Sequence, residues 1–264
     1  MNKQLVYKNK SVFYNVSGEG NPVVLIHGVP EDGSMWHNQT EFLSNRYQLI
    51  IPDLPGSGKS ELIGDVSIDA MTDVIKFILD AETISKAVII GHSMGGYVSV
   101  AFAEKFPGML KALGLFHSSA YADSDEKKEA RKKNIAFIQK HGSYDFIRQS
   151  TPGLFSDTFK KDNKELVEGI IEKYINFNPD SLAAYQQAMM NRSDRRKVLE
   201  QIVEPVLFII GAHDKAIPFE DSMQQCHIPA LSYIHILKNS GHMGMLEEVE
   251  KSNEILEKFL KDVW

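Results

Sequence analysis

The chain has 264 residues, 43% of them hydrophobic and 24% charged, which is typical of a globular protein with room for one large domain or a domain with an insertion. A formal net charge of -6 argues against a nucleic-acid partner, because such proteins carry a basic surface. The single cysteine excludes an internal disulfide, and no apolar run approaches the roughly 18 residues of a membrane span. The first residues also lack the apolar core of a signal peptide, so we expect a cytoplasmic protein without a membrane partner.

Strands and helices alternate through most of the predicted chain. Residues 23–26 are continuously apolar, which is typical of a strand buried on both faces of a parallel sheet. Two short apolar stretches flank Asn9-Lys10 and predict a hairpin. In chain order, the pattern predicts strands at residues 5–7, 12–16, 23–26, 47–51, 87–90, 110–116, 205–211 and 233–237. Helices are predicted at residues 35–43, 68–80, 94–105 and 247–260.

The alternation stops between the sixth and seventh predicted strands. Residues 123–196 show helical periodicity and no convincing strand, and they open with a run of charged residues at 123–129. We therefore predict an α/β fold with a mostly parallel sheet of about eight strands, helices on both faces and a helical cap inserted after about the sixth strand. The predicted core comprises residues 1–118 and 200–264, and the predicted cap comprises residues 119–199.

The sequence Gly91-His92-Ser93-Met94-Gly95 lies between a predicted buried strand and a predicted helix. This layout is that of a nucleophile elbow, in which a strained turn projects a serine hydroxyl above the sheet. The glycines leave room for the neighbouring backbone, and the helix directs free N–H groups towards charge that develops beside the serine. We expect Ser93 to be a nucleophile.

A serine hydroxyl is a weak nucleophile and needs a base that is oriented by an acid. Asp214 and His242 each follow a predicted strand, so the order serine, acid, base matches three loops at the carboxyl ends of strands. His213 is an alternative base, although its place beside the acid suits a loop residue better. His117 also follows a strand, and we expect it to pack in the core or to form part of a pocket wall.

The loop after the strand at residues 23–26 is well placed to complete an oxyanion hole. Two backbone N–H groups are needed near the serine, and we assign them to Val29 and Met94. Pro30 has no N–H and cannot donate. We expect His27 to stabilise this loop by hydrogen bonding.

Together these motifs resemble the α/β-hydrolase fold superfamily over about residues 5–118 and 200–264. The sequence His27-Gly28-Val29-Pro30 is similar to that of epoxide hydrolases and haloalkane dehalogenases, but those enzymes use an aspartate nucleophile and this chain has Ser93. With serine, the resemblance implies acyl transfer, as in esterases, lactonases, C–C hydrolases of the meta-cleavage type and cofactor-free perhydrolases. The superfamily also includes signalling proteins with slow turnover.

The sequence therefore predicts a serine hydrolase that cleaves a small carboxylic ester, lactone or thioester through an acyl-enzyme, without a cofactor. A C–C hydrolase is the first alternative, and Arg148 or Arg192 would then anchor the substrate carboxylate; otherwise each arginine is expected to form a surface salt bridge. A perhydrolase and a slow-turnover ligand-binding regulator are the others.

Two further kinds of site are not supported by the sequence. Gly58-Lys59-Ser60 resembles the end of a P-loop, but the glycine that should precede it is Asp53. No cluster of histidine, cysteine and acidic residues has the spacing of metal ligands. The expected partner is a small ester-like molecule with an apolar part. Apolar cap residues either line its pocket or, as we expect for most, form the cap's own core: Phe137, Phe146, Phe155, Phe159, Met189 and Met190.

Overall fold

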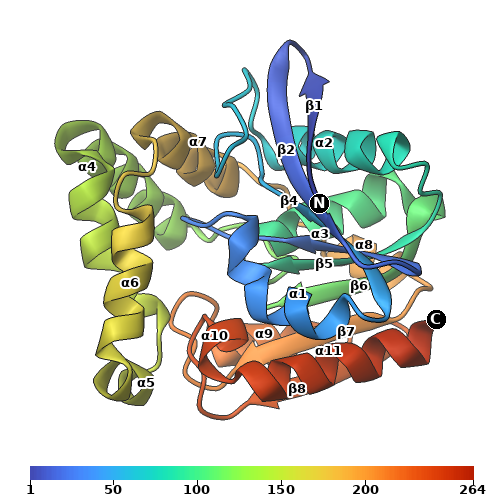
Figure 1. The fold of residues 1–264 in the computed structure, drawn as a ribbon. Helices are drawn as coiled ribbons and strands as arrows, with labels where there is room; N and C mark the ends of the chain where they lie inside the picture. Colours follow the sequence, from blue (N-terminus) through green and yellow to red (C-terminus); the bar gives the residue numbers. More distant parts are fainter.

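A computed structural model describes all residues from 1 to 264, and its centre is one eight-stranded sheet (Figure 1). The strands are β1 (Asn2–Tyr7), β2 (Lys10–Ser17), β3 (Asn21–Ile26), β4 (Tyr47–Pro52), β5 (Ala87–His92), β6 (Leu110–Phe116), β7 (Val206–Gly211) and β8 (Ser232–Leu237). Their order across the sheet is β1-β2-β4-β3-β5-β6-β7-β8. Only β2 runs antiparallel to its neighbours, so the predicted mostly parallel sheet of eight strands is confirmed.

Helices cover both faces of this sheet. They are α1 (His37–Leu43), α2 (Ile68–Ala81), α3 (Met94–Lys105), α4 (Asp125–Ser150), α5 (Asp157–Asp162), α6 (Lys164–Tyr174), α7 (Pro179–Met190), α8 (Arg196–Gln201), α9 (Phe219–Gln225), α10 (Gly244–Glu247) and α11 (Val249–Val263). Three short 3₁₀ turns are η1 (Gly33–Trp36), η2 (Pro107–Met109) and η3 (Thr151–Leu154). Helices α2 and α3 pack together in one hydrophobic core, and α1 packs with α11 on the opposite face (Figure 1).

The continuous apolar run of β3 is explained by these two cores. Val24 and Ile26 point into the core beneath α2 and α3, whereas Val23 and Leu25 point into the core beneath α1 and α11. Successive side chains of a strand point to opposite faces, so a strand covered on both sides needs an apolar residue at every position. The expectation of a strand buried on both faces is confirmed.

The first hairpin differs slightly from the prediction. Tyr7 pairs with Lys10, so the turn consists of Lys8 and Asn9 and not of Asn9 and Lys10. Both turn residues have positive φ angles, 49° and 62°. A two-residue turn whose twist matches that of its strands requires this conformation at both positions, and asparagine tolerates it well.

The chain between β6 and β7 forms helices and no strand, as expected from its periodicity. Figure 1 shows α4, α5, α6 and α7 grouped beside the sheet. Helix α4 begins after Ser124, whose hydroxyl accepts a hydrogen bond from Lys127 N, and it is interrupted at Gly142, where φ is 81°. We refer to the helices α4 to α7 as the cap; the boundaries drawn at residues 119 and 199 stay predictions.

The two ends of this helical segment are joined by a buried ionic cluster. Arg192 Nη1 lies 2.6 Å from Asp123 Oδ1, and Arg131 binds the other oxygen of the same carboxylate. The guanidinium of Arg192 also stacks over the ring of Tyr97 in α3, 3.9 Å from its centroid. This cluster connects the cap to the helix that follows Ser93.

No helix contains an apolar stretch long enough to span a membrane.

Candidate active site

Ser93 occupies the tight turn between β5 and α3. Its backbone adopts φ 52° and ψ -118°, a conformation that residues other than glycine rarely adopt and that is typical of functional sites. A Cβ atom at Gly91 would overlap the carbonyl of Gly95, and one at Gly95 would overlap the carbonyls of Ile26 and His27. Only glycine therefore fits on either side of Ser93, which explains the spacing of the motif.

Asp214 and His242 lie together at the ends of β7 and β8. His242 Nδ1 donates a hydrogen bond of 2.8 Å to Asp214 Oδ2, while Asp214 Oδ1 accepts from the N–H groups of Ala216 and Ile217 at 2.8 and 2.9 Å. With both of its oxygens engaged, the carboxylate is fixed, and it fixes the orientation of the imidazole. The sequence placed these two residues in separate loops, and the fold brings them together.

The residue that precedes Ser93, His92, contacts His242 directly. The His92 ring lies 4.9 Å from the His242 ring between centroids, and His92 Nε2 is 2.9 Å from the carbonyl oxygen of His242. No hydrogen bond joins the Ser93 hydroxyl to His242 in this structure. Such bonds are often long without substrate and shorten in the reacting complex.

Charge in this site keeps Asp214 ionised and makes His242 more basic. Burial alone would raise the pKa of Asp214, but His242, His117 and the Ile217 N–H outweigh it and lower the pKa to about 2. Burial alone would lower the pKa of His242, and the nearby carboxylates of Asp214, Glu31 and Glu247 raise it above the ordinary histidine value. The pair therefore combines a stable anion with an imidazole that readily accepts a proton.

The alternative base His213 is exposed and does not contact the Asp214 carboxylate; its backbone N–H donates to Ser240 O. His117, by contrast, is completely buried beside Asp214. His117 Nδ1 lies 3.5 Å from Asp214 Oδ2, and its Nε2 accepts from Gly244 N at 3.1 Å. His117 is buried, as expected for a residue that packs in the core, but its ring also faces the carboxylate that orients His242.

The loop after β3 lies directly against Ser93. A Cβ atom placed at Gly28 would lie 2.9 Å from Ser93 Cβ. The N–H of Val29 has no acceptor within the chain, and Met94 opens α3, where N–H groups have no intrahelical acceptor. His27 Nε2 accepts from Leu54 N at 2.9 Å and so stabilises the loop, as expected. Both N–H groups assigned to the oxyanion hole are therefore free to bind an anion.

Two glutamates of the site, Glu31, which is buried, and Glu247, which is half-buried, were missed by the sequence reasoning. Glu31 Oε2 accepts from Gly28 N at 2.7 Å. Glu247 Oε1 accepts from Gly241 N and Met243 N at 2.9 and 3.0 Å, and thereby fixes the loop that carries His242. Nothing in the local sequence distinguishes either residue from a surface glutamate, because their partners come from the folded loops.

Neither arginine considered as a carboxylate anchor is free. Arg148 is exposed and pairs with Glu168 and Glu172 of the cap, at 3.0 and 3.4 Å, as expected for a surface salt bridge. For Arg192 that expectation is wrong: its side chain is buried and bound to Asp123, because the two ends of the cap segment meet there. A charge already neutralised in a buried cluster is poorly suited to bind a substrate carboxylate.

The apolar cap residues fall into several environments. Phe155 and Met189 are buried in the two hydrophobic cores, and Phe146 and Phe159 pack against one of them. Phe137 instead lies against the ring of His141, with 4.6 Å between centroids. The expectation of core packing therefore holds for at least four of the six apolar cap residues, namely Phe146, Phe155, Phe159 and Met189.

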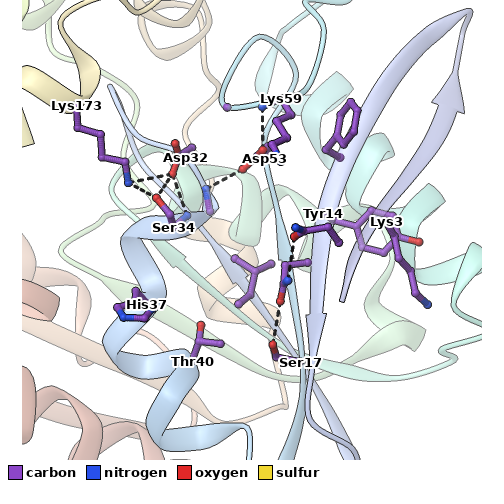
Figure 2. A pocket seen from close by; sticks show the side chains of 16 residues that line it. Lys3, Tyr14, Ser17, Asp32, Ser34, His37, Thr40, Asp53, Lys59 and Lys173 are labelled. Carbon is purple, nitrogen blue, oxygen red and sulfur yellow. Dashed lines mark hydrogen bonds and ion pairs between the residues drawn. The ribbon is translucent and has the colours of Figure 1, made fainter.

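A polar groove of about 860 Å³ lies beside β2, β4 and α1 (Figure 2). At its edge, Lys173 of α6 reaches Ser34 and lies 3.6 Å from Asp32 Oδ1, and the Tyr174 hydroxyl donates to the same carboxylate oxygen at 3.2 Å. Ser93, Asp214 and His242 do not line this groove. The contacts of Lys173 and Tyr174 at its edge connect the cap to the segment that follows the Val29 loop.

No group of histidine, cysteine and acidic side chains is positioned to hold a metal ion. The chemistry that the site residues support by themselves is that of a nucleophilic serine with a histidine base. An imidazole oriented by a carboxylate can take the hydroxyl proton, and two free N–H groups can stabilise an oxyanion.

The chain is similar to several known proteins in sequence and in structure. Residues 21–140 match the family model described as alpha/beta hydrolase fold. The chain is 25% identical to 3-oxoadipate enol-lactonase 1 of Acinetobacter baylyi, over 97% of this chain and 95% of the lactonase. It is also 25% identical to 2-hydroxy-6-oxo-6-phenylhexa-2,4-dienoate hydrolase of Comamonas testosteroni, over 95% and 91%. A thermophilic esterase from Thermogutta terrifontis superimposes with a TM-score of 0.93 at 28% identity, over 100% of this chain and 99% of the esterase.

The fold, the elbow and these similarities define the class of protein. The chain has the alpha/beta hydrolase fold, and the family match and the similarity to the esterase support a hydrolase. The resemblance inferred from the motifs is confirmed. The relatives include both lactone and C–C hydrolases, so these similarities alone do not identify the bond that this chain cleaves.

Proposed function

We propose that this protein hydrolyses small carboxylic esters, including lactones or thioesters, through an acyl-enzyme formed on Ser93. The observation that carries the proposal is the arrangement around that residue. A serine on a strained elbow lies against a loop with a free Val29 N–H, while the adjacent His92 contacts the His242–Asp214 pair. This is the set of groups that acyl transfer requires.

In the first step, His242 takes the proton of the Ser93 hydroxyl while the serine oxygen attacks the ester carbonyl carbon. The carbonyl oxygen becomes an oxyanion that accepts hydrogen bonds from the N–H groups of Val29 and Met94, each worth about 3 kcal/mol in comparable sites. Asp214 stabilises the imidazolium that forms. His242 then gives its proton to the leaving alcohol, and the acyl group remains on Ser93.

In the second step, a water molecule replaces the alcohol. His242 takes one of its protons while the oxygen attacks the acyl carbon, and the same N–H groups hold the second oxyanion. Collapse of this intermediate breaks the bond to Ser93, which regains its proton from His242. The products are a carboxylic acid and the free enzyme.

The arginines and apolar side chains of the cap favour an ester bond over a C–C bond. Arg148 and Arg192, the candidate anchors for a dienoate carboxylate, are engaged in other ion pairs. A neutral ester needs no such anchor, and apolar cap side chains suit an acyl or alkyl group. The enol-lactonase and the thermophilic esterase are both named for activities of this type.

A chain-length series of p-nitrophenyl esters, assayed with the wild type and Ser93→Ala, tests the proposal. We expect turnover by the wild type, with a preference for short or medium acyl groups, and a loss of at least about 10⁴-fold in the variant. The parallel assay uses a 2-hydroxy-6-oxo-dienoate. Cleavage of this compound with no hydrolysis of any ester would contradict the proposal in favour of a C–C hydrolase. Tight binding of an ester without turnover would instead favour a ligand-binding regulator, and peroxide-dependent halogenation in the presence of an organic acid would favour a perhydrolase.

A further inference from the structure

The loop that carries His242 has three successive backbone N–H groups inside the protein. Gly241, His242 and Met243 are all buried, and a buried N–H without an acceptor is costly. Oε1 of Glu247 accepts from Gly241 N and Met243 N at 2.9 and 3.0 Å. The remaining N–H, that of His242, donates at 2.6 Å to the carbonyl oxygen of Leu154, at the end of η3 between the cap helices α4 and α5. The backbone of the base is therefore held by one side chain and by the cap.

The other oxygen of Glu247 binds the same part of the cap. Oε2 accepts from the N–H of Ser156 at 2.8 Å, and Ser156 caps the start of α5. The cap segment 154–156 also lies tightly against the loop, because a Cβ atom at Gly241 would lie 2.7 Å from Ser156 N and 2.8 Å from Leu154 O. One carboxylate thus joins three backbone N–H groups, two from the loop of His242 and one from the cap segment.

We propose that Glu247 is a positioning residue for the ester hydrolysis described above: it fixes the backbone of His242 and links that position to the docked cap segment 154–156. Asp214 binds one ring nitrogen and sets the rotation of the imidazole, but the ring can be aimed at Ser93 only if its backbone is fixed as well. A misplacement of about 1 Å can cost roughly 10²-fold in rate. The inference rests on the proposed function, in which His242 is the base.

Glu248 provides a matched control in the next position of the chain. Its Oε2 accepts from Asn239 N at 2.9 Å and from the Ser240 hydroxyl at 2.7 Å. It is half-buried like Glu247 and binds the same loop, but at the residues that precede Gly241. Glu248→Ala therefore removes a carboxylate from this loop without removing an acceptor of residues 241–243 or of the cap segment.

Two substitutions of Glu247 separate its contacts. Glu247→Ala removes all three, and we expect kcat for p-nitrophenyl esters to fall by roughly 10- to 100-fold. In Glu247→Gln the single amide oxygen should face the two loop N–H groups, since that satisfies two donors and the cap offers only one. The amide nitrogen then lies opposite Ser156 N–H, where neither group can accept. We expect this variant to keep kcat within about threefold of the wild type.

The assays are run at about pH 9, above the titration range of an ordinary histidine, so that loss of the Glu247 charge does not change the protonation of the base. Glu248→Ala should keep kcat within about threefold. If Glu247→Ala loses no more than Glu248→Ala, Glu247 does not position the base and the proposal is wrong. If Glu247→Gln is as slow as Glu247→Ala, the charge of Glu247 matters and its contacts with the loop do not, which also overturns the proposal.

Hydrogen exchange followed by mass spectrometry tests the link to the cap without a substrate. In Glu247→Gln we expect faster exchange in the cap segment 154–156 and unchanged exchange at residues 241–243. Glu247→Ala should speed exchange in both segments, and Glu248→Ala in neither. Exchange of the cap segment at the wild-type rate in Glu247→Gln would contradict the link. If no ester is hydrolysed, the proposed function fails, but these exchange rates still decide whether Glu247 connects the cap to the loop of His242.

Discussion

The buried ring of His117 faces the carboxylate of Asp214, with Nδ1 3.5 Å from Oδ2. The Gly244 N–H donates to Nε2, so the proton of a neutral ring lies on Nδ1 and points at the carboxylate. Burial lowers the pKa of His117 well below the ordinary value, which keeps the ring neutral. Asp214 therefore lies between two imidazoles, of which only that of His242 bonds closely.

This relationship predicts a measurable contribution of His117 to catalysis. His117→Leu removes the donor and places a branched residue at a φ of 49°, so we expect a loss of roughly tenfold in kcat/KM together with lower stability. Asparagine tolerates positive φ and carries an amide N–H, so His117→Asn should retain most of the activity. Equal kcat/KM for His117→Leu and the wild type would show that Asp214 needs no second imidazole.

The contact between Gly28 and Ser93 predicts a position where a single methyl group is harmful. In Gly28→Ala the new Cβ would lie 2.9 Å from both Ser93 Cβ and His92 Nδ1, which requires the oxyanion loop to move. We expect kcat to fall by at least about 10²-fold, because displaced donors no longer meet the oxyanion. Gly64→Ala is the control, since its Cβ would meet no atom within 4 Å. Normal kcat in Gly28→Ala would contradict the assignment of this loop.

The acid–base pair predicts the pH dependence of activity. His242 must be neutral to take the serine proton, and its pKa is raised by Asp214, Glu31 and Glu247 against the effect of burial. The acid limb of kcat/KM should therefore have its midpoint above about 6.5, the ordinary histidine value. In Asp214→Asn the activity should fall by roughly 10⁴-fold. A midpoint below 6 in the wild type would be inconsistent with an ionised Asp214 beside the base.

The same carboxylate predicts a pH dependence of stability. The pKa of Asp214 is about 2 in the folded protein and about 4 in an unfolded chain, so ionised Asp214 stabilises the fold above pH 4 by about 2 kcal/mol. This contribution is lost as the pH falls through 2. The stability difference between the wild type and Asp214→Asn, measured by urea unfolding, should therefore shrink between pH 4 and pH 2. A constant difference across this range would argue against the depressed pKa.

The buried cluster of Asp123, Arg131 and Arg192 predicts a large effect on stability at a site far from Ser93. Asp123 neutralises two arginines, and its side chain is fully buried beside Arg192. Asp123→Asn leaves buried positive charge without a counter-charge, which should lower the free energy of unfolding by about 3 kcal/mol. Glu129→Gln, in an exposed pair with Lys132, should change it by less than about 1 kcal/mol. Similar effects of the two substitutions would show that the buried pair contributes no more than a surface pair.

Much of the fold and the main site residues could be predicted because their signals are local. Ser93 is marked by two glycines that the turn itself requires, and Asp214 and His242 each lie in the loop that follows a strand. In a parallel sheet, the carboxyl ends of the strands meet at one edge, so local positions imply spatial neighbours. The eight strands followed from the same local patterns.

The rest depends on contacts between distant parts of the chain. Glu31 follows Val29 and Pro30 and looks like a surface residue, yet its partner His92 is 61 positions away. Arg192 likewise resembles a surface residue in the sequence, yet its buried partner Asp123 lies 69 positions earlier in the chain. No periodicity or spacing encodes such pairs, because burial of a charge is decided only when the elements pack.

The central claim is that Ser93 becomes covalently modified during the reaction. Treatment with a fluorophosphonate, followed by digestion and mass spectrometry of the peptides, tests it without knowledge of the natural substrate. We predict one adduct, located on Ser93, absent from Ser93→Ala and formed much more slowly in Asp214→Asn. No adduct in the wild type, or an adduct on another residue, would contradict the account.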